Sequence, residues 1–399
     1  MLAEGSCERC GHSYLVDLPS GHGLVYPAAL DLNTGGTLDP GEAEWFSSWL
    51  QQAWDQPDTQ PVGLTVENRN TNPKTGSGDA VLVNTLDRIY GHSVLKLLGA
   101  QRELEGAHDV ILLISRALAE LVPSGVAEVW IVEEPISRLA GWLSDLDRRL
   151  AGELDRLGSC LLSPVPPHPH CSIYAIERFV PGIEPARNGD PSVVLSLRED
   201  RTWGGGRNQL HNANELADTL QDAYPDIGIA AIGLGAPGGL SEWILDLRNP
   251  SSNGEHERRW LGLMRGADLA IGVHGSNLLL PSALAAATVE LVPESRYGDL
   301  FQATLLAEHD PVLALNNHRT LYGDAELTDL TPQRVGEVAI ALLDGHQRFE
   351  AMMTGPLARG ESAGPEALPG KPPREAHPEG APQRGGRGLL RRLRGLSRA

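Results

Sequence analysis

The chain has 399 residues, 41 % of them hydrophobic, which is enough to bury the cores of two domains. Its formal net charge at pH 7 is −19, and this argues against a nucleic-acid partner, because nucleic-acid binding needs a basic surface. The chain has four cysteines and shows neither a long apolar run nor a secretory signal, so we expect a cytoplasmic protein without a membrane-spanning helix or a disulfide scaffold.

Residues 1–60 show little periodicity, and we expect an irregular N-terminal segment. It contains a Cys-x-x-Cys pair, Cys7 and Cys10. A structural zinc ion needs four ligands, and Cys160 and Cys171 from a distant loop could supply the other two. This site would form only if the N-terminal segment packs on that loop.

Downstream of this segment, strands and helices alternate. Apolar residues at helical spacing over 86–104, followed by a continuous apolar run over 109–114, are typical of a helix and a parallel strand covered on both faces. A Pro-rich stretch interrupts the pattern, and a second series follows it. We therefore predict an α/β fold with two Rossmann-like domains, residues 61–170 and 171–350.

The same patterns predict individual elements inside these two domains. We expect a helix over 136–157, a strand over 173–180, a helix over 297–306 and a strand over 311–315. The last predicted helix covers 332–343.

Residues 351–399 are rich in Pro, Gly, Glu and Arg, so we expect a disordered tail. Within it, residues 387–398 place leucines on one helical face among arginines. A basic amphipathic helix of this kind can lie on an anionic membrane surface. The alternative is a basic end that only increases solubility.

A predicted strand over 269–273 ends in the turn His274-Gly275-Ser276-Asn277, which leads directly into an apolar helix. The first N–H groups of a helix have no internal partners, and the helix dipole adds positive potential there. Together with the side chains of the turn, these groups predict a site for a nucleotide diphosphate. The alternative is a capped helix beside a core histidine.

A Gly-rich loop after another predicted strand carries Arg198, Arg201 and Arg207. Arginine binds phosphate oxygens through bidentate, charge-assisted hydrogen bonds, and cations stabilise a leaving diphosphate. We expect these arginines to bind the donor's diphosphate, with Arg198 foremost because it is closest to the strand. They could instead pair with neighbouring acidic residues. Glu290, in a later strand, could accept a hydrogen bond from a ribose hydroxyl.

Two residues of the first domain could accept a proton from an attacking hydroxyl. Asp79 lies in a Gly-Ser-Gly-Asp segment, and His92 lies in a predicted helix. Either would serve as a general base if its side chain faced the cleft between the domains. The alternatives are a helix cap for Asp79 and a buried, hydrogen-bonded ring for His92.

The segments Tyr90–Leu98, Leu195–Arg198, His274–Leu278 and Val289–Leu291 occur in an order and spacing that resembles glycosyltransferase family 61, over roughly residues 75–310. The resemblance implies a GT-B architecture, in which two Rossmann-like domains face each other across a cleft and the second carries most of the nucleotide sugar. It also implies inverting transfer that needs no metal or other cofactor.

Individual roles follow from the same resemblance. It implies that Arg198 and the His274 turn bind the diphosphate, that Glu290 lies near the nucleoside, and that His92 faces the acceptor. The chain departs from the family pattern by having Glu199 where a second arginine is usual.

These features predict a glycosyltransferase that moves a sugar from a nucleotide-sugar donor to a polysaccharide or lipid-linked acceptor, with the basic tail holding the protein at the inner face of the membrane. Two other functions fit the same features. A polysaccharide pyruvyl transferase would use phosphoenolpyruvate and need no nucleoside pocket. A catalytically inactive GT-B scaffold would bind neither donor.

Overall fold

The computed structural model describes residues 2–38, 44–69, 80–166, 173–206, 209–250, 254–302, 305–307 and 317–354. The chain divides into two compact units, residues 1–349 and 350–399, and both predicted domains lie in the first unit. The basic segment predicted at 387–398 lies outside the described residues. No helix in the described ranges combines the length and apolar character needed to span a membrane.

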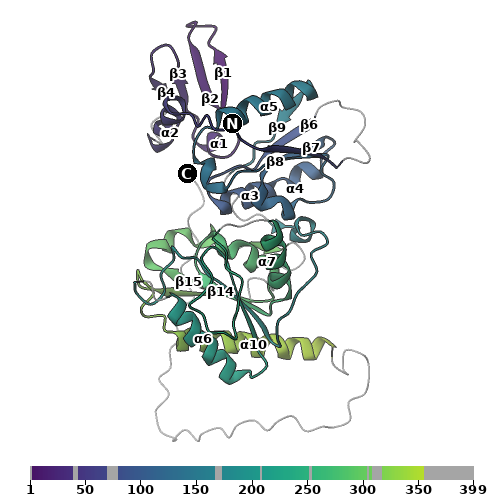
Figure 1. The fold of residues 1–399 in the computed structure, drawn as a ribbon, viewed down its shortest axis with the longest axis vertical. Helices are drawn as coiled ribbons and strands as arrows, with labels where there is room; N and C mark the ends of the chain where they lie inside the picture. The colour runs from purple at the N-terminus through teal and green to yellow at the C-terminus, as the bar shows by residue number, and fades with distance from the viewer. Residues whose placement is uncertain are drawn as a thin grey trace, which may run out of the picture. The chain divides into compact units, whose positions relative to one another are not determined.

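The N-terminal segment forms a small antiparallel sheet rather than the irregular structure that we expected (Figure 1). Its elements are β1 (Leu2–Ser6), β2 (Ser13–Asp17), α1 (His22–Val25), β3 (Ala29–Asp31), β4 (Thr37–Leu38) and α2 (Glu44–Asp55). Leu15 and Leu30 from the strands and Phe46 and Leu50 from α2 form its core. The outer strands β1 and β4 are largely exposed and contain few apolar residues, so no apolar pattern marks them in the sequence.

The first α/β domain contains a five-stranded sheet in the order β5-β8-β7-β6-β9. Its elements are β5 (Leu64–Asn68), β6 (Ala80–Asn84), α3 (Tyr90–Gly99), α4 (Gln101–Leu104), β7 (Asp109–Ser115), the 3-10 helix η1 (Arg116–Leu121), β8 (Glu128–Val132), the 3-10 helix η2 (Ile136–Ala140), α5 (Ser144–Leu157) and β9 (Cys160–Leu162). All neighbours are parallel except β5, which is antiparallel at the edge. Ile111 and Leu113 pack with α5, and Leu112 and Ile114 pack with α3, so both faces of the sheet are covered.

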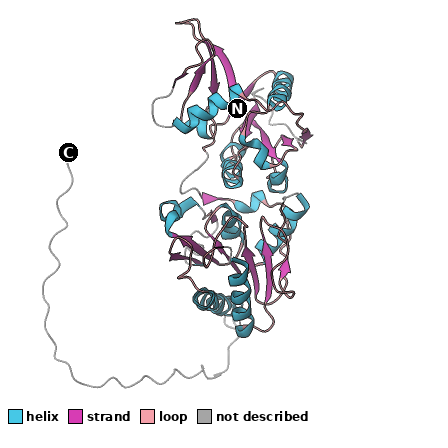
Figure 2. Cartoon of the chain, turned by 60° about the vertical axis from the view of Figure 1, so that its left-hand side comes forward, coloured by secondary structure: helices cyan, strands magenta, loops and turns pink. Residues whose placement is uncertain are grey.

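The second α/β domain contains six parallel strands in the order β13-β12-β11-β14-β15-β17. Its elements are β11 (Ser192–Ser196), α6 (Gln209–Ala223), β12 (Gly228–Ile232), β13 (Leu245–Asp246), α7 (Gly254–Gly266), β14 (Leu269–Val273), the 3-10 helix η4 (Ser276–Leu278), α8 (Leu279–Leu284), β15 (Thr288–Pro293), the 3-10 helix η5 (Glu294–Gln302), β17 (His318–Gly323) and α10 (Pro332–Thr354). Counted along the chain, this is the strand order of a Rossmann fold. The helices α6 and α10 cover one face, and α7 and α8 cover the other (Figures 1 and 2).

Several predicted elements differ from the structure. The helix predicted over 86–104 begins only at Tyr90 and is divided into α3 and α4, and the last predicted helix, 332–343, continues to Thr354 as α10. The helix predicted over 136–157 is divided into η2 and α5, because Gly141 adopts extended backbone after η2. The strand predicted over 173–180 is only the two-residue β10 (Ile173–Tyr174), followed by the 3-10 helix η3 (Ile176–Phe179). The helix predicted over 297–306 is η5 followed by β16 (Leu306–Ala307), which pairs with β10. The strand predicted over 311–315 lies outside the described residues.

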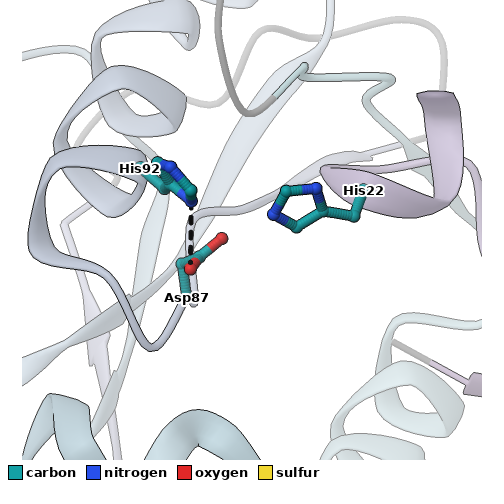
Figure 3. A group of neighbouring side chains, drawn as sticks. All are labelled: His22, Asp87 and His92. Carbon is teal, nitrogen blue, oxygen red and sulfur yellow. Dashed lines mark ion pairs between the residues drawn. The ribbon is translucent and has the colours of Figure 1, made fainter. Parts of the chain in front are cut away.

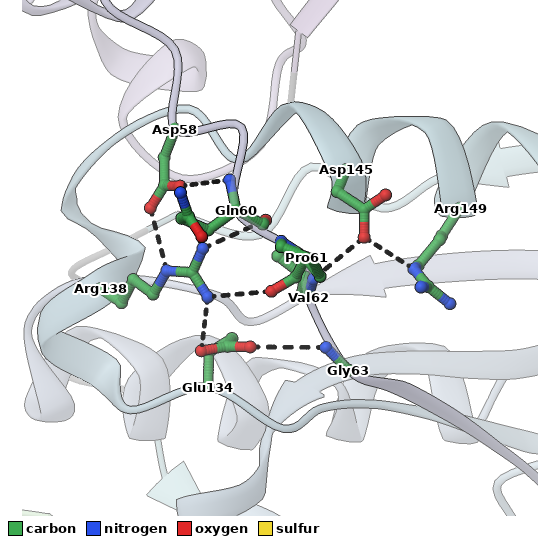
Figure 4. Close-up of polar contacts among 9 residues, drawn as sticks. All are labelled: Asp58, Gln60, Pro61, Val62, Gly63, Glu134, Arg138, Asp145 and Arg149. Atoms are coloured by element: carbon green, nitrogen blue, oxygen red, sulfur yellow. Dashed lines mark hydrogen bonds and ion pairs between the residues drawn. The ribbon is translucent and has the colours of Figure 1, made fainter.

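The connection between α2 and β5 is held on the first α/β domain by Arg138 (Figure 4). The guanidinium donates to both carboxylate oxygens of Asp58, at 2.9 and 3.0 Å, and lies 2.8 Å from Glu134. It also donates to the backbone carbonyls of Gln60 and Pro61, each at 3.2 Å. The chain leaving the small sheet is therefore fixed before it enters β5.

One hydrophobic core runs through both α/β domains. Leu118 and Leu121 of η1 belong to the same buried cluster as Trp260 and Met264 of α7. At the rim, Arg258 of α7 donates to Glu120 of η1 at 2.9 Å. This shared core fixes how the strand ends of the two sheets meet.

Candidate functional site

The carboxyl ends of both sheets line one cavity of about 540 Å³. The loops after β6, β7 and β8 contribute Arg88, Ile89, Tyr90, Arg116, Ala117 and Glu133 to Ser137, and the ends of β11, β12 and β14 contribute Ser196, Arg198, Gly233, Ser276 and Asn277. A cavity of this size suits a small-molecule substrate. Ligands of open parallel sheets bind at this edge.

The strand order reverses once in each sheet along this edge. In the second sheet, β12 and β13 lie on one side of β11, and β14, β15 and β17 lie on the other. In the first sheet, β6 is flanked by β7 and β9 in the same way. Arg198 follows β11, His274 follows β14, and Asp87 follows β6. Polar side chains therefore stand at both reversal points, where such sheets bind ligands.

The turn after β14 depends on glycine. Gly275 has a φ of 148°, and a Cβ atom there would lie 2.8 Å from Nη2 of Arg201 and 3.0 Å from Oδ1 of Asn277. The turn continues as η4 and then α8, a helix of six residues. The dipole of so short a helix is weak, so the positive potential at this turn comes mainly from side chains.

Two of the predicted arginines lie at this turn in different environments. Arg198 donates to both oxygens of Asp200, at 2.9 and 2.8 Å, and its Nη1 lies 3.3 Å from Oγ of Ser276. The Nε of Arg201 is buried and has no hydrogen-bond partner within the described ranges. Burial lowers the pKa of Arg201, and the nearby charges of Arg198 and Arg296 lower it further. A half-buried guanidinium next to other arginines, with its Nη2 close to the Gly275 turn, is suited to binding an anion.

Glu290 is buried and faces other side chains of the sheet. Its Oε1 lies 2.6 Å from Nδ1 of His274, and its Oε2 lies 3.0 Å from Nε2 of His318. Burial acts to raise the pKa of Glu290, but the hydrogen bonds with the two histidines outweigh it and hold the pKa below its usual value. Since both oxygens are engaged and the residue is 1 % exposed, its place differs from the nucleoside contact that we predicted. Glu290 instead orients His274 before the Gly275 turn.

Asn277 joins the ends of the two central strands. Its amide donates to the carbonyl and the hydroxyl of Ser196, at 3.2 and 3.1 Å, and the Ser196 hydroxyl donates to the Asn277 carbonyl at 2.9 Å. These bonds fix the turn after β14 to the end of the neighbouring strand β11. Arg207, the third predicted arginine, lies outside the described residues.

The loop after β6 brings Asp87 together with His22 and His92 (Figure 3). Lys96 lies beside the same carboxylate. Asp87 Oδ1 lies 3.4 Å from Nδ1 of His92, and Oδ2 lies 3.2 Å from Nζ of Lys96. Burial acts to raise the pKa of Asp87, but the interactions with His92 and Lys96 outweigh it and hold the pKa well below its usual value. The ring of His22, from α1, points toward the pair, with its centroid 5.5 Å from that of His92. Burial lowers the pKa of His22.

The start of α3 packs directly on the Gly275 turn. A Cβ atom at Gly91 would lie 2.6 Å from Cβ of Ser276 and 3.1 Å from Cδ1 of Leu279, so no larger residue fits without movement. His92 follows Gly91 in the chain. The structure therefore brings the predicted base close to the turn that we expected to bind phosphate.

A second cavity of about 700 Å³ adjoins the first, and Arg88 and Ile89 line both. Its walls include four aromatic side chains, Trp45, Phe46, Trp49 and Trp142, together with His22, Asp87, His92 and Lys96. The small N-terminal sheet and α2 therefore form part of the space around the Asp87 cluster.

The predicted zinc site is not assembled within the part of the chain that the structure describes. Cys7 and Cys10 lie in and beside the turn between β1 and β2, whereas Cys160 begins β9. The described residues contain one group of three possible metal ligands whose ligand atoms lie within 4.8 Å of one another. It consists of His22, Asp87 and His92, and includes none of these cysteines. Cys171 and the predicted base Asp79 lie outside the described residues.

Sequence reasoning missed Asp87, Lys96, His22 and Arg296. A signal for Lys96 was available, because His92 and Lys96 are four residues apart and share one face of a helix. Asp87 was missed because the helix was predicted from residue 86, whereas α3 begins at Tyr90 and Asp87 lies in the loop before it. His22 belongs to a four-residue helix and carries no local signal.

Comparisons with known proteins identify no family. No family model matches the chain, and no curated protein matches it significantly. Among solved structures, it resembles the E. coli heptosyltransferase WaaC with ADP at 16 % identity and a TM-score of 0.42, over 66 % of this chain and 99 % of that one. It also resembles the E. coli ADP-heptose lipopolysaccharide heptosyltransferase II, at 14 % identity and a TM-score of 0.41, over 67 % of this chain and 99 % of that one. The glycosyltransferase SnogD from Streptomyces nogalater matches at 14 % identity and a TM-score of 0.20, over 66 % of this chain and 72 % of that one.

Similarities at these TM-scores do not bear on activity, so function has to be argued from the site. The fold follows from the sheets themselves. Two Rossmann-like α/β domains direct the carboxyl ends of their strands into one cavity. This is a GT-B-like architecture, as the sequence predicted.

Proposed function

We propose that the protein is a glycosyltransferase that binds the diphosphate of a nucleotide sugar at the Gly275 turn. The observation that carries this proposal is the buried Nε of Arg201, which lacks a partner within the described residues and lies beside Arg198 at the reversal point of the second sheet. Cations at this place stabilise the negative charge that a leaving diphosphate develops. Arginines alone can supply that charge, so the proposal needs no metal at the diphosphate.

The proposed reaction is a direct displacement that inverts the anomeric carbon. The acceptor hydroxyl attacks that carbon as the bond to the diphosphate oxygen breaks. The hydroxyl proton passes to Nε2 of His92, while Asp87 holds the opposite ring nitrogen, Nδ1, at 3.4 Å. Asp87 is a positioning residue, because it acts through His92.

The two adjoining cavities support separate places for donor and acceptor. Arg198 and Ser276 line the first cavity, whereas His92 lines the second. Aromatic side chains next to polar groups, as in the second cavity, suit a sugar ring that has one apolar face. The polysaccharide or lipid-linked acceptor is proposed from the enzyme class and not from any particular residue.

The donor class is tested by thermal unfolding of the full chain with UDP, GDP, CDP, TDP or phosphoenolpyruvate. A ligand that binds only the folded protein raises its stability by about 2.7 kcal/mol at one hundred times its dissociation constant. We expect one nucleoside diphosphate to raise the unfolding midpoint and phosphoenolpyruvate to leave it unchanged. A rise with phosphoenolpyruvate alone would indicate pyruvyl transfer, and no rise with any ligand would favour an inactive scaffold.

A further inference from the structure

His22, Asp87 and His92 lie close enough together to share a metal ion. Their ligand atoms all lie within 4.8 Å of one another. Among the described residues, this is the one group of three possible metal ligands that lie so close together. Figure 3 shows the His22 ring directed toward the Asp87 and His92 side chains. The three residues come from α1, the loop after β6, and α3, so only the folded chain brings them together.

The separation within the pair also fits a shared ion. Nδ1 of His92 and Oδ1 of Asp87 are 3.4 Å apart, which is long for a hydrogen bond between these groups. Two ligands that each bind zinc at about 2.0–2.2 Å in tetrahedral geometry lie roughly 3.4 Å apart. The pair therefore already has the spacing of two zinc ligands.

Lys96 completes the support that a ligating carboxylate needs. Its ammonium lies 3.2 Å from Oδ2 of Asp87, which leaves Oδ1 to face the histidines. Carboxylates that bind metals are usually held by such an outer partner, which fixes their orientation. The arrangement favours a carboxylate that binds the ion through one oxygen.

The geometry points to a zinc site formed by His22, Asp87 and His92. Two imidazoles and one carboxylate are ligands that zinc accepts, and three protein ligands leave a fourth position open. That position would face the cavity of about 700 Å³ that all three residues line. This site is separate from the cysteine site predicted from the sequence.

Zinc at this site would oppose the proposed proton transfer. An ion bound to Nδ1 of His92 takes the lone pair of that nitrogen, so the neutral ring carries its proton on Nε2. Nε2 then donates a proton and cannot accept one. If the proposed function is correct, zinc inhibits the transferase; zinc binding itself does not depend on that function.

The test measures zinc binding to the full chain by calorimetry, in a background in which Cys7, Cys10, Cys160 and Cys171 are all replaced by Ser, so that no thiol competes. We expect one zinc ion per chain, and affinity about tenfold or more weaker in His22→Gln. His211→Gln is the matched control, because His211 is exposed and forms an exposed ion pair with Glu215. Magnesium, which prefers oxygen ligands, should not bind at this site.

Cobalt(II) gives a second readout that does not depend on activity or affinity. Bound in tetrahedral geometry, it should produce visible absorption in the parent protein and lose it in His22→Gln. Circular dichroism confirms that the variant is folded. Equal zinc affinity in His22→Gln and the parent, no zinc binding by the parent, or binding that requires Cys7 and Cys10 would each overturn the proposal. None of these results depends on whether a nucleotide binds.

Discussion

Glu290 shows how a single buried charge organises the edge of the second sheet. Its carboxylate joins His274 of the Gly275 turn to His318 of β17, and all three side chains are largely buried. In a buried network, removing one charge leaves its partners without full compensation. The position of His274 therefore depends on the charge of Glu290.

Replacing Glu290 with Gln is expected to destabilise the protein by about 2–4 kcal/mol, because the amide cannot accept hydrogen bonds from both histidines. The measurement is urea unfolding at neutral pH. Glu215→Gln is the control, since Glu215 pairs with His211 in an exposed pair 3.2 Å apart, and it should change stability by less than about 0.5 kcal/mol. Equal effects of the two substitutions would show that Glu290 does not organise the turn.

The close approach of α3 to η4 is the contact between elements that matters most for the site. It exists because Gly91 has no side chain, which lets the backbone of α3 approach Ser276. The loop after β6 and the turn after β14 are thereby held together. A change at Gly91 would move the proposed base relative to the proposed phosphate site.

We expect Gly91→Ala to cost about 1–3 kcal/mol of stability and to weaken nucleotide binding, because the new methyl group would push η4 away. Chemical unfolding and calorimetry measure the two effects. Gly152→Ala, within α5 and with nothing within 4 Å of an added Cβ, should instead stabilise the protein by about 0.5–1 kcal/mol. Unchanged nucleotide binding in a folded Gly91→Ala protein would show that this contact does not shape the site.

The sequence predicted the elements of the two α/β domains where periodicity was strong. The strand over 269–273 has the predicted bounds, and the predicted apolar run over 109–114 forms β7 with one further residue. The small N-terminal sheet was missed because its outer strands, β1 and β4, are largely exposed and contain few apolar residues. Helix and 3-10 elements could not be told apart at 297–306, because both bury apolar residues at similar spacing.

The candidate site was only partly accessible to the same reasoning. Arg198, Arg201 and the His274 turn could be found because they follow strongly apolar strands. The local pairing of Arg198 with Asp200 was the alternative stated from the sequence, whereas the burial of Nε of Arg201 depends on tertiary packing. The Asp87 cluster joins three separate segments, and spacing along the chain cannot show such a juxtaposition.

At the scale of the whole molecule, two sheets of one architecture supply different chemistry to adjoining cavities. The second sheet presents arginines at its reversal point, and the first presents a carboxylate with a histidine and a lysine, to which α1 adds His22. A reaction in which one substrate loses a diphosphate and the other loses a proton needs both. The account therefore depends on the second sheet binding a diphosphate through Arg201.

The most direct test is calorimetric binding of the preferred nucleoside diphosphate to Arg201→Met, with Arg334→Met as the control. Arg334 lies exposed on α10, away from the strand ends, so its loss should not alter affinity. We predict that Arg201→Met binds the nucleotide about tenfold to a hundredfold more weakly, because the charge-assisted hydrogen bonds to phosphate are lost. Equal affinity in the folded Arg201→Met protein and the parent would contradict the account.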